Sequence, residues 1–144
     1  MIKQCIVALA FLAATGCDGA ESQWSEPHHM LSQVNIHAPP NVQVAVIEAT
    51  KKFGERYGYQ VDASNNLPRE GRQVMQVLLT RSDGVMIVTD NFMNADTLDT
   101  GFYAKKENAD WRTAKEEWLK EVRAVVGKQG NIVDVILEKD QTPK

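Results

Sequence analysis

Two stretches near the middle of the chain alternate apolar and polar residues and predict a β-hairpin. They cover 74–80 and 85–92, and a period of two is typical of strands that bury one face. Asp83 and Gly84 lie between them, and an Asp-Gly pair is typical of a two-residue hairpin turn. With these two residues as the turn, one face is expected to be the core face. It would hold Met75, Val77, Leu79, Met86, Val88 and Phe92, with Gln76, Thr80, Thr89 and Asn91 on the other face.

Three shorter stretches also predict strands. Val34 and Ile36 alternate with polar residues within 31–36, as expected for a half-buried strand. Residues 59–62 form a second candidate. The third candidate is 131–138, where one face would hold Val133, Val135 and Leu137.

One stretch with helical spacing follows Pro39 and Pro40, which both suit a first helical turn, with Asn41 as a candidate cap. Gly58 would end this helix. The β-branched residues of the same stretch favour a strand instead, so both interpretations stay open. The helical stripe consists of Val42, Ala45, Val46, Ala49, Phe53 and Tyr57.

A second helix is predicted from Asp110, which can cap its N-terminus, to about Val126, with Gly127 as the stop. Its apolar stripe consists of Trp111, Ala114, Trp118, Val122 and Val125. Because the two tryptophans lie at helical spacing, we expect them in the core rather than in a ligand platform.

The predicted order is strand, helix, two or three antiparallel strands, helix and strand. This order resembles the split β-α-β arrangement of ferredoxin-like domains, which implies an α+β fold with two helices packed on one face of an antiparallel sheet. The resemblance lies in the order of elements alone, and that arrangement hosts many functions. We expect a single domain over 28–140, with a long connection over 93–109.

The composition fits one globular domain. The chain has 144 residues, of which 43% are hydrophobic and 24% charged, well away from the composition of disordered chains. Its formal net charge of -3 gives no general attraction to nucleic acid or anionic lipid, both of which need clustered Lys and Arg. The sequence therefore disfavours DNA or RNA binding.

The first sixteen residues have the layout of a secretory signal. Lys3 supplies a positive charge, 6–14 is an unbroken apolar run, and small residues follow it. A bilayer-spanning helix needs about 20 apolar residues, so this run is too short to span. We expect export of the protein and removal of 1–16.

The segment Leu12-Ala13-Ala14-Thr15-Gly16-Cys17 resembles the lipobox of bacterial prolipoproteins, although Ala14 stands where leucine is commonest. The resemblance implies that the Cys17 thiol receives a diacylglycerol, that the leader is cut before it, and that the new amino group is acylated. Asp18 then occupies a sorting position, which implies the periplasmic face of the inner membrane. The same small residues also fit ordinary signal cleavage, which leaves a soluble exported protein with a free Cys17 as an alternative.

Cysteine usage favours the lipid interpretation. Cys5 lies in the expected leader, so Cys17 would be the one cysteine of the mature chain, whereas exported proteins usually pair their cysteines. Acyl chains stabilise membrane attachment by about 0.8 kcal/mol per buried CH₂. After Cys17, residues 18–27 are polar with Gly and Pro apart from Trp24, and we expect 17–27 to form the lipidated cysteine and a flexible tether whose ten residues reach at most about 35 Å.

The sequence contains no recognisable catalytic motif, and we expect no catalytic residue and no cofactor. G-x-S-x-G and the phosphate-binding glycine patterns are absent. Three histidines flank the first strand (His28, His29 and His37), but their spacing does not favour one metal site. The acidic stretch 90–99 lacks the spacing of a calcium loop, so metal binding is not expected.

Four residues are candidates for contact with a protein partner: Leu78, Ile87, Phe102 and Tyr103. Leu78 and Ile87 would lie on the otherwise polar face of the hairpin, and the two aromatics fall in the expected connection. We therefore expect a lipid-anchored envelope protein that binds another envelope or secreted protein and has no enzymatic activity. The alternative is an envelope hydrolase that uses carboxylates such as Asp90, Asp96 and Glu107. Glycan binding would rest on the tryptophans alone.

Overall fold

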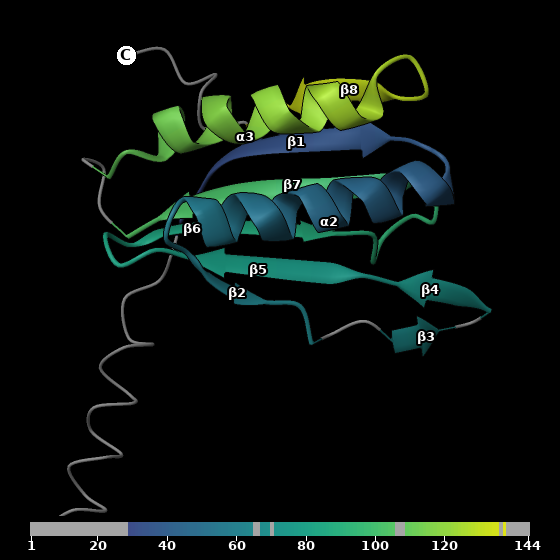
Figure 1. Ribbon diagram of the computed structural model, residues 1–144, viewed down its shortest axis with the longest axis horizontal. Helices are drawn as coiled ribbons and strands as arrows, with labels where there is room; N and C mark the ends of the chain where they lie inside the picture. Colours follow the sequence, from purple (N-terminus) through teal and green to yellow (C-terminus); the bar gives the residue numbers. More distant parts are fainter. Residues whose placement is uncertain (1–28, 65–66, 70, 106–108, 136, 138–144) are drawn as a thin grey trace, which may run out of the picture.

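The structure is a computed structural model that describes residues 29–64, 67–69, 71–105, 109–135 and 137. Its main feature is a six-stranded sheet in the order β2-β5-β6-β7-β1-β8, in which all neighbouring strands are antiparallel (Figure 1). The strands are β1 (His29–His37), β2 (Gln60–Asp62), β5 (Gln76–Thr80), β6 (Val85–Asp90), β7 (Thr97–Ala104) and β8 (Asn131–Val135). A separate short hairpin consists of β3 (Leu67–Arg69) and β4 (Arg72–Val74).

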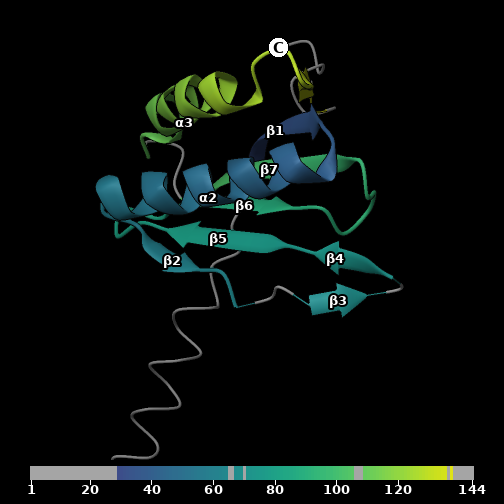
Figure 2. The same cartoon turned by 45° about the vertical axis from the view of Figure 1, so that its right-hand side comes forward.

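Two helices lie on one face of the sheet, α2 (Pro40–Arg56) and α3 (Trp111–Val126), as Figure 2 shows. They are joined to each other by a hydrogen bond from Trp118 Nε1 to Thr50 Oγ1 of 3.1 Å and by an ion pair between Arg56 and Glu121. Trp118 also packs edge-on against Phe102 of β7, with 5.4 Å between ring centroids. The prediction of an α+β fold with both helices on one face is therefore confirmed.

The connections form two interlocked split β-α-β units. Because antiparallel neighbours alternate in direction, β1 and β2 run parallel on either side of β5, β6 and β7, and α2 joins them. In the same way β7 and β8 run parallel on either side of β1, and α3 joins them. The predicted interlocking is present, with more strands in the sheet than the sequence indicated.

The core lies between the helices and the sheet. Alternate residues of each strand point toward the helices, as the pleat requires. The approach of α2 to the sheet is close at Gly54, where a Cβ atom would lie 2.6 Å from Leu79 Cδ2. The largest fully buried apolar side chains are Trp118, Phe53, Phe102, Ile36, Leu79, Ile87 and Leu98.

The predicted register of the central hairpin is wrong by one residue. Arg81 N donates to Val85 O at 2.9 Å and Gly84 N to Arg81 O at 3.0 Å, so the loop contains three residues rather than two. Gly84 has φ +92°, as expected for the last residue of such a loop. A shift of one residue moves a strand's side chains to the opposite face. Val85, Ile87 and Thr89 are therefore buried, whereas Met86 and Val88 face away from the helices.

Thr89 and Asn91, predicted to point outward, are buried. The Thr89 hydroxyl lies 3.0 Å from that of Thr100 on the neighbouring strand, so the two hydroxyls satisfy each other. Phe92, predicted to be in the core, is 40% exposed because the chain has left the strand at Asp90.

The expected connection over 93–109 is wrong in its middle, where Thr97–Ala104 forms the central strand β7. This strand pairs with β6 on one side and β1 on the other. Its Gly101 and Asp99 weaken the sequence signal for a strand, because glycine and aspartate are uncommon within strands.

Smaller differences concern element ends. The helical interpretation of α2 holds, but its cap residue is Pro39 rather than Asn41. The second helix ends before Gly127 as predicted. Strand β8 ends at Val135, and its Val133, which is 39% exposed, lies on the face away from the helices, because Ile132 is the residue that packs on the core.

Candidate functional site

The sheet surface opposite the helices, here called the open face, carries a mixed set of half-buried side chains. No described element packs across it, and both views show the helices on the other side (Figures 1 and 2). Its central residues are Gln33 and Asn35 of β1, Leu78 of β5, Met86, Val88 and Asp90 of β6, and Asp99, Gly101 and Tyr103 of β7.

Four apolar side chains of the open face lie side by side and are here called the apolar patch: Leu78, Met86, Val88 and Tyr103. Leu78 is paired with Val88, and Met86 with Tyr103, across neighbouring strands. The Tyr103 ring lies over Gly101, where a Cβ atom would be 2.6 Å from Tyr103 Cε2. Burial against the sheet raises the pKa of the Tyr103 phenol, and the nearby Asp90 raises it further. The patch is thus apolar but bears a hydroxyl that stays protonated.

Two carboxylates stand beside the apolar patch. Asp90 and Asp99 are directly opposite each other on β6 and β7. Partial burial raises the pKa of both carboxyls, and the charge of Asp99 raises the pKa of Asp90 further. The hydrogen bond of 3.1 Å that Asp90 Oδ1 accepts from Phe92 N acts in the opposite direction and lowers the pKa of Asp90. His37 acts in the opposite direction on the Asp99 pKa. The structure therefore pairs Asp90 with Asp99, a carboxylate that the hydrolase alternative did not name.

The structure separates the four predicted partner-binding residues. Leu78 and Tyr103 lie on the open face and are half-buried. Ile87 and Phe102 are fully buried between sheet and helices, so the prediction that they contact a partner is wrong. The cause for Ile87 is the hairpin register, and for Phe102 it is the pleat of β7, which directs it toward Trp118.

A second candidate lies at the end of the sheet where β1 ends and α2 begins. The side chain of Gln43 is buried there and donates from Nε2 to Ala38 O at 2.9 Å and to Ala95 O at 2.7 Å. Asn91 Nδ2 donates to Gln43 Oε1 at 3.3 Å, and Asn91 Oδ1 accepts from Met75 N at 2.8 Å. These two amides hold α2, the start of β5 and the 91–96 loop together.

A cavity of about 110 Å³, here called the end cavity, opens beside these amides. It is lined by Pro40, Gln43, Val44, Arg72, Gln73, Met75, Asn91 and Ala95. Sequence reasoning missed this site because its residues come from three separate segments, 40–44, 72–75 and 91–95. A weak signal was present in Gln43 and Asn91, polar residues beside otherwise apolar stretches.

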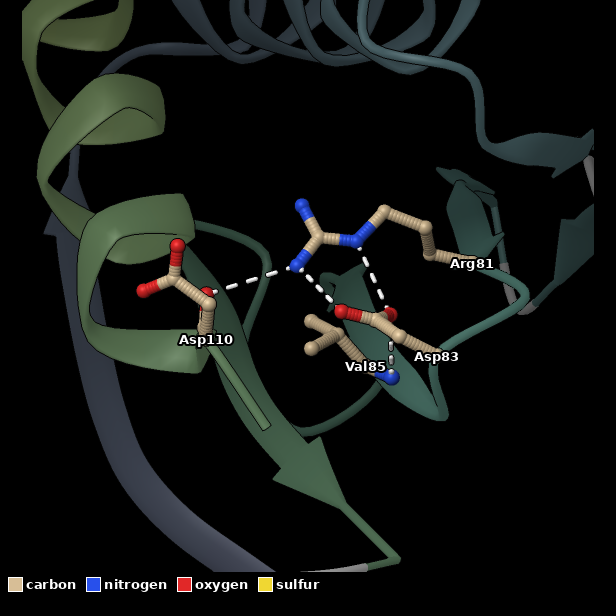
Figure 3. A network of polar contacts seen from close by, with 4 residues as sticks. All are labelled: Arg81, Asp83, Val85 and Asp110. Atoms are coloured by element: carbon tan, nitrogen blue, oxygen red, sulfur yellow. Dashed lines mark hydrogen bonds and ion pairs between the residues drawn. The ribbon is translucent and has the colours of Figure 1, made fainter. Parts of the chain in front are cut away.

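At the opposite end of the sheet, the loop of the β5–β6 hairpin contacts the start of α3 (Figure 3). Arg81 donates from Nε and Nη2 to the two carboxylate oxygens of Asp83, at 2.9 and 2.8 Å, and Nη2 also reaches Asp110 O at 3.4 Å. The Arg81 hydrogen bonds lower the pKa of the Asp83 carboxyl. Asp110 precedes α3 as predicted, but its side chain makes no capping bond.

Tyr59 packs beneath the same arginine, with the guanidinium carbon 5.2 Å from its ring centroid. Its hydroxyl is buried without a hydrogen-bond partner among the described residues. Burial raises the pKa of Tyr59 to about 12. The contacts of this cluster serve the fold, because Arg81 links the hairpin loop to the residue that precedes α3.

The remaining predicted groups do not assemble into one site. His29 is exposed, and His37 Nδ1 lies 3.1 Å from Thr97 Oγ1. Asp96 is exposed on its loop, and within the described ranges no three His, Cys, Asp or Glu side chains gather as metal ligands. Cys17, Asp18, His28 and Glu107 lie outside the described residues. In the described part of the chain, neither α2 nor α3 is long and apolar enough to span a membrane.

The sequence was compared with protein-family models and with curated proteins, and neither comparison found a match.

Proposed function

We propose that the protein is a lipid-anchored bacterial envelope lipoprotein that acts as a non-enzymatic binding module for another envelope or secreted protein. The single observation that carries the binding role is the apolar patch on the open face. Four half-buried apolar side chains lie side by side there on three paired strands. Apolar groups gathered on one exposed surface are typical of interaction sites.

The surroundings of the patch fit a protein partner. Asp90, Asp99, Gln33 and Asn35 border it with charged and amide groups, and protein interfaces combine an apolar centre with a polar rim. Tyr103 supplies an aromatic ring with a protonated hydroxyl, a combination enriched among residues that dominate binding energy. A rigid sheet fixes these side chains, so little conformational entropy is lost on binding.

The anchor is proposed from the sequence. Cys17 follows a lipobox-like segment and 17–27 would form the tether. His29 begins β1 at the end of the sheet where Ala104 and Val85 lie. The tether would therefore join the domain at that end, and the 91–96 loop would lie at the other end, a strand length of about 30 Å away. The open face would then be reachable from the periplasm beside the membrane.

Mass spectrometry of the mature N-terminus tests the anchor. We expect a chain that begins at Cys17 and carries acyl groups, and we expect the Cys17→Ser variant to be released when membranes are washed. If the native chain carries no lipid and washes off membranes as readily as the variant, the anchor is disproved.

Crosslinking in intact membranes tests the binding surface. Leu78→Lys places a charge within the apolar patch, and Gln60→Lys adds the same charge on the same face at the outermost strand. We expect Leu78→Lys to reduce a reproducible crosslinked partner at least tenfold, since a desolvated charge opposes burial of the patch. The control should leave the yield unchanged. Equal yields from both variants would refute the open face as the interface.

A further inference from the structure

The segments that line the end cavity carry three exposed apolar side chains. Val44 lines it and is 49% exposed, and the 91–96 loop beside it carries Phe92, 40% exposed, and Met93, 85% exposed. These are three of the six large apolar side chains exposed in the described part of the chain. Exposed Met and Phe residues beside a hollow are typical of protein-binding surfaces rather than of solvated loops.

Hydrogen bonds from α2 and from the neighbouring segments hold the 91–96 loop in place. Gln43 and Asn91 form the buried amide bonds described above, and Ala38 N donates to Asp96 O at 3.1 Å. Arg72 adds two bonds, from Nη1 to Asn91 O at 2.8 Å and from Nη2 to Phe92 O at 2.5 Å. A loop fixed in this way presents Phe92 and Met93 with little entropy left to lose on binding.

The size of the end cavity limits what can enter it. Small-molecule sites usually measure about 300–1,000 Å³, whereas this cavity measures about 110 Å³. Pro40, Val44, Met75 and Ala95 supply apolar walls. The space therefore suits one aliphatic side chain, not a cofactor.

The charge of Arg72 at the rim of the end cavity indicates which residue type should stand next to the aliphatic side chain in the partner. Arg72 is the one charged residue among the described residues that line the cavity, and no described carboxylate forms an ion pair with it. Its bonds to two loop carbonyls use two of the five guanidinium N–H donors. A carboxylate next to the bound aliphatic side chain would meet the remaining donors, in a charge-assisted hydrogen bond. Asp90 and Asp96 lie near the loop but do not line the cavity.

We propose that the end cavity and the exposed side chains Val44, Phe92 and Met93 form a docking site for a partner segment that presents one aliphatic side chain beside a carboxylate. This inference deepens the proposed function by naming a second contact and its chemistry. It rests on the role as a binding module but not on the lipid anchor, and it concerns a different surface from the apolar patch.

The methionines provide a direct test, because they report on the two surfaces separately. Met75 lines the cavity and Met93 lies on the loop between two lining residues, Asn91 and Ala95, whereas Met86 belongs to the apolar patch. The mature protein is produced in cells with ¹³C-methyl methionine as the label. If it is lipidated, it is placed in lipid nanodiscs for the measurement. The probe is the acetylated, amidated peptide Gly-Ser-Leu-Glu-Ser-Gly. We expect it to shift the Met75 and Met93 methyl signals and to leave Met86 unchanged.

Matched peptides and variants complete the test. Replacing the leucine of the peptide by serine should weaken binding tenfold or more, and replacing its glutamate by lysine should weaken it about threefold or more. Val44→Thr should weaken binding about fourfold, whereas Val125→Thr, the same substitution on an exposed position of α3, should not. The inference is overturned if Met75 and Met93 do not shift, if the serine peptide binds equally well, or if both variants behave alike. A shift at Met86 alone would assign the peptide to the open face and overturn it too.

Discussion

The carboxylates of Asp90 and Asp99 lie directly opposite each other on the open face, on the neighbouring strands β6 and β7. Burial and mutual repulsion raise the pKa of Asp90, and burial raises that of Asp99. A carboxyl with a raised pKa in the folded state binds its proton more tightly there than in the unfolded chain. Stability is then greatest below the ordinary carboxyl pKa and decreases as pH rises through the window up to the folded-state pKa. Above that window the penalty is constant.

We therefore expect Asp90→Asn to stabilise the protein at pH 7 by about 0.2–1 kcal/mol, the scale of a cross-strand charge pair. Asn can keep the Oδ1 acceptor for Phe92 N. The gain should shrink toward pH 3, where both carboxyls approach protonation. Urea unfolding at both pH values measures it, with Asp96→Asn on the neighbouring loop as the exposed control. A gain that is the same at both pH values would show that charge is not its cause.

Single residues also show which side chains the sequence could assign to the core and which it could not. Trp118 was expected in the core from its helical spacing, and it is fully buried. Phe102 and Ile87 have the same apolar character as Leu78, and nothing local distinguishes them. Only strand pairing decides that the first two face the helices and the third faces outward.

At the scale of elements, the β5–β6 hairpin shows how one loop residue changes a surface. The Asp-Gly pair correctly marked the turn, but Ser82 also belongs to the loop, which Arg81 N closes onto Val85 O. The two possible registers bury opposite faces of β6. The observed one places Val85 and Ile87 in the core and so creates the apolar patch from Met86 and Val88.

This register makes a clear prediction for two neighbouring residues. Ile87→Ala should destabilise the protein by about 2–5 kcal/mol, because Ile87 is fully buried and its removal leaves a cavity. Met86→Ala, on the open face, should cost about 1 kcal/mol or less. Urea unfolding midpoints measure both. If Met86→Ala is the more costly substitution, the two-residue turn is the correct one.

The helices were easier to predict than the strands. For α2 and α3 the start and stop signals, the prolines and Gly127, are local in the sequence, and they place the boundaries within a few residues. Strand β7 has no comparable local signal, because Gly101 and Asp99 are residue types uncommon in strands and because its partner β1 is far away in the chain. The sequence therefore predicts a connection where the central strand of the sheet lies.

At the scale of the whole molecule, the sheet has a protected centre and two outer strands. β7 and β1 are each paired on both sides, whereas β2 and β8 are the outermost strands of the described sheet. Local opening requires least energy where few contacts are lost.

We expect hydrogen exchange to follow this order. Peptides that cover 97–104 and 33–37 should exchange most slowly, near the rate set by global unfolding, and those that cover 60–62 and 131–135 should exchange at least tenfold faster. Hydrogen-exchange mass spectrometry at several times checks this. Slow exchange over 131–135 equal to that of β7 would mean that β8 is covered by something beyond its pairing with β1.

The sequence by itself determined the fold class, the second helix and the presence of the central hairpin, and it left the stretch of α2 open between helix and strand. It also predicts an export signal and an acylated Cys17, and these stay predictions. All of these depend on residues close together in the chain, through periodicity, capping and turn chemistry. The tertiary structure alone decided the hairpin register, the position of β7, the apolar patch and the end cavity. The register depends on which of two loops the same Asp-Gly pair forms, and packing of the β6 faces decides between them. The other features depend on hydrogen bonds and packing between separate segments, such as Gln43 with Ala95 and Phe102 with Trp118, and no local pattern encodes such pairing.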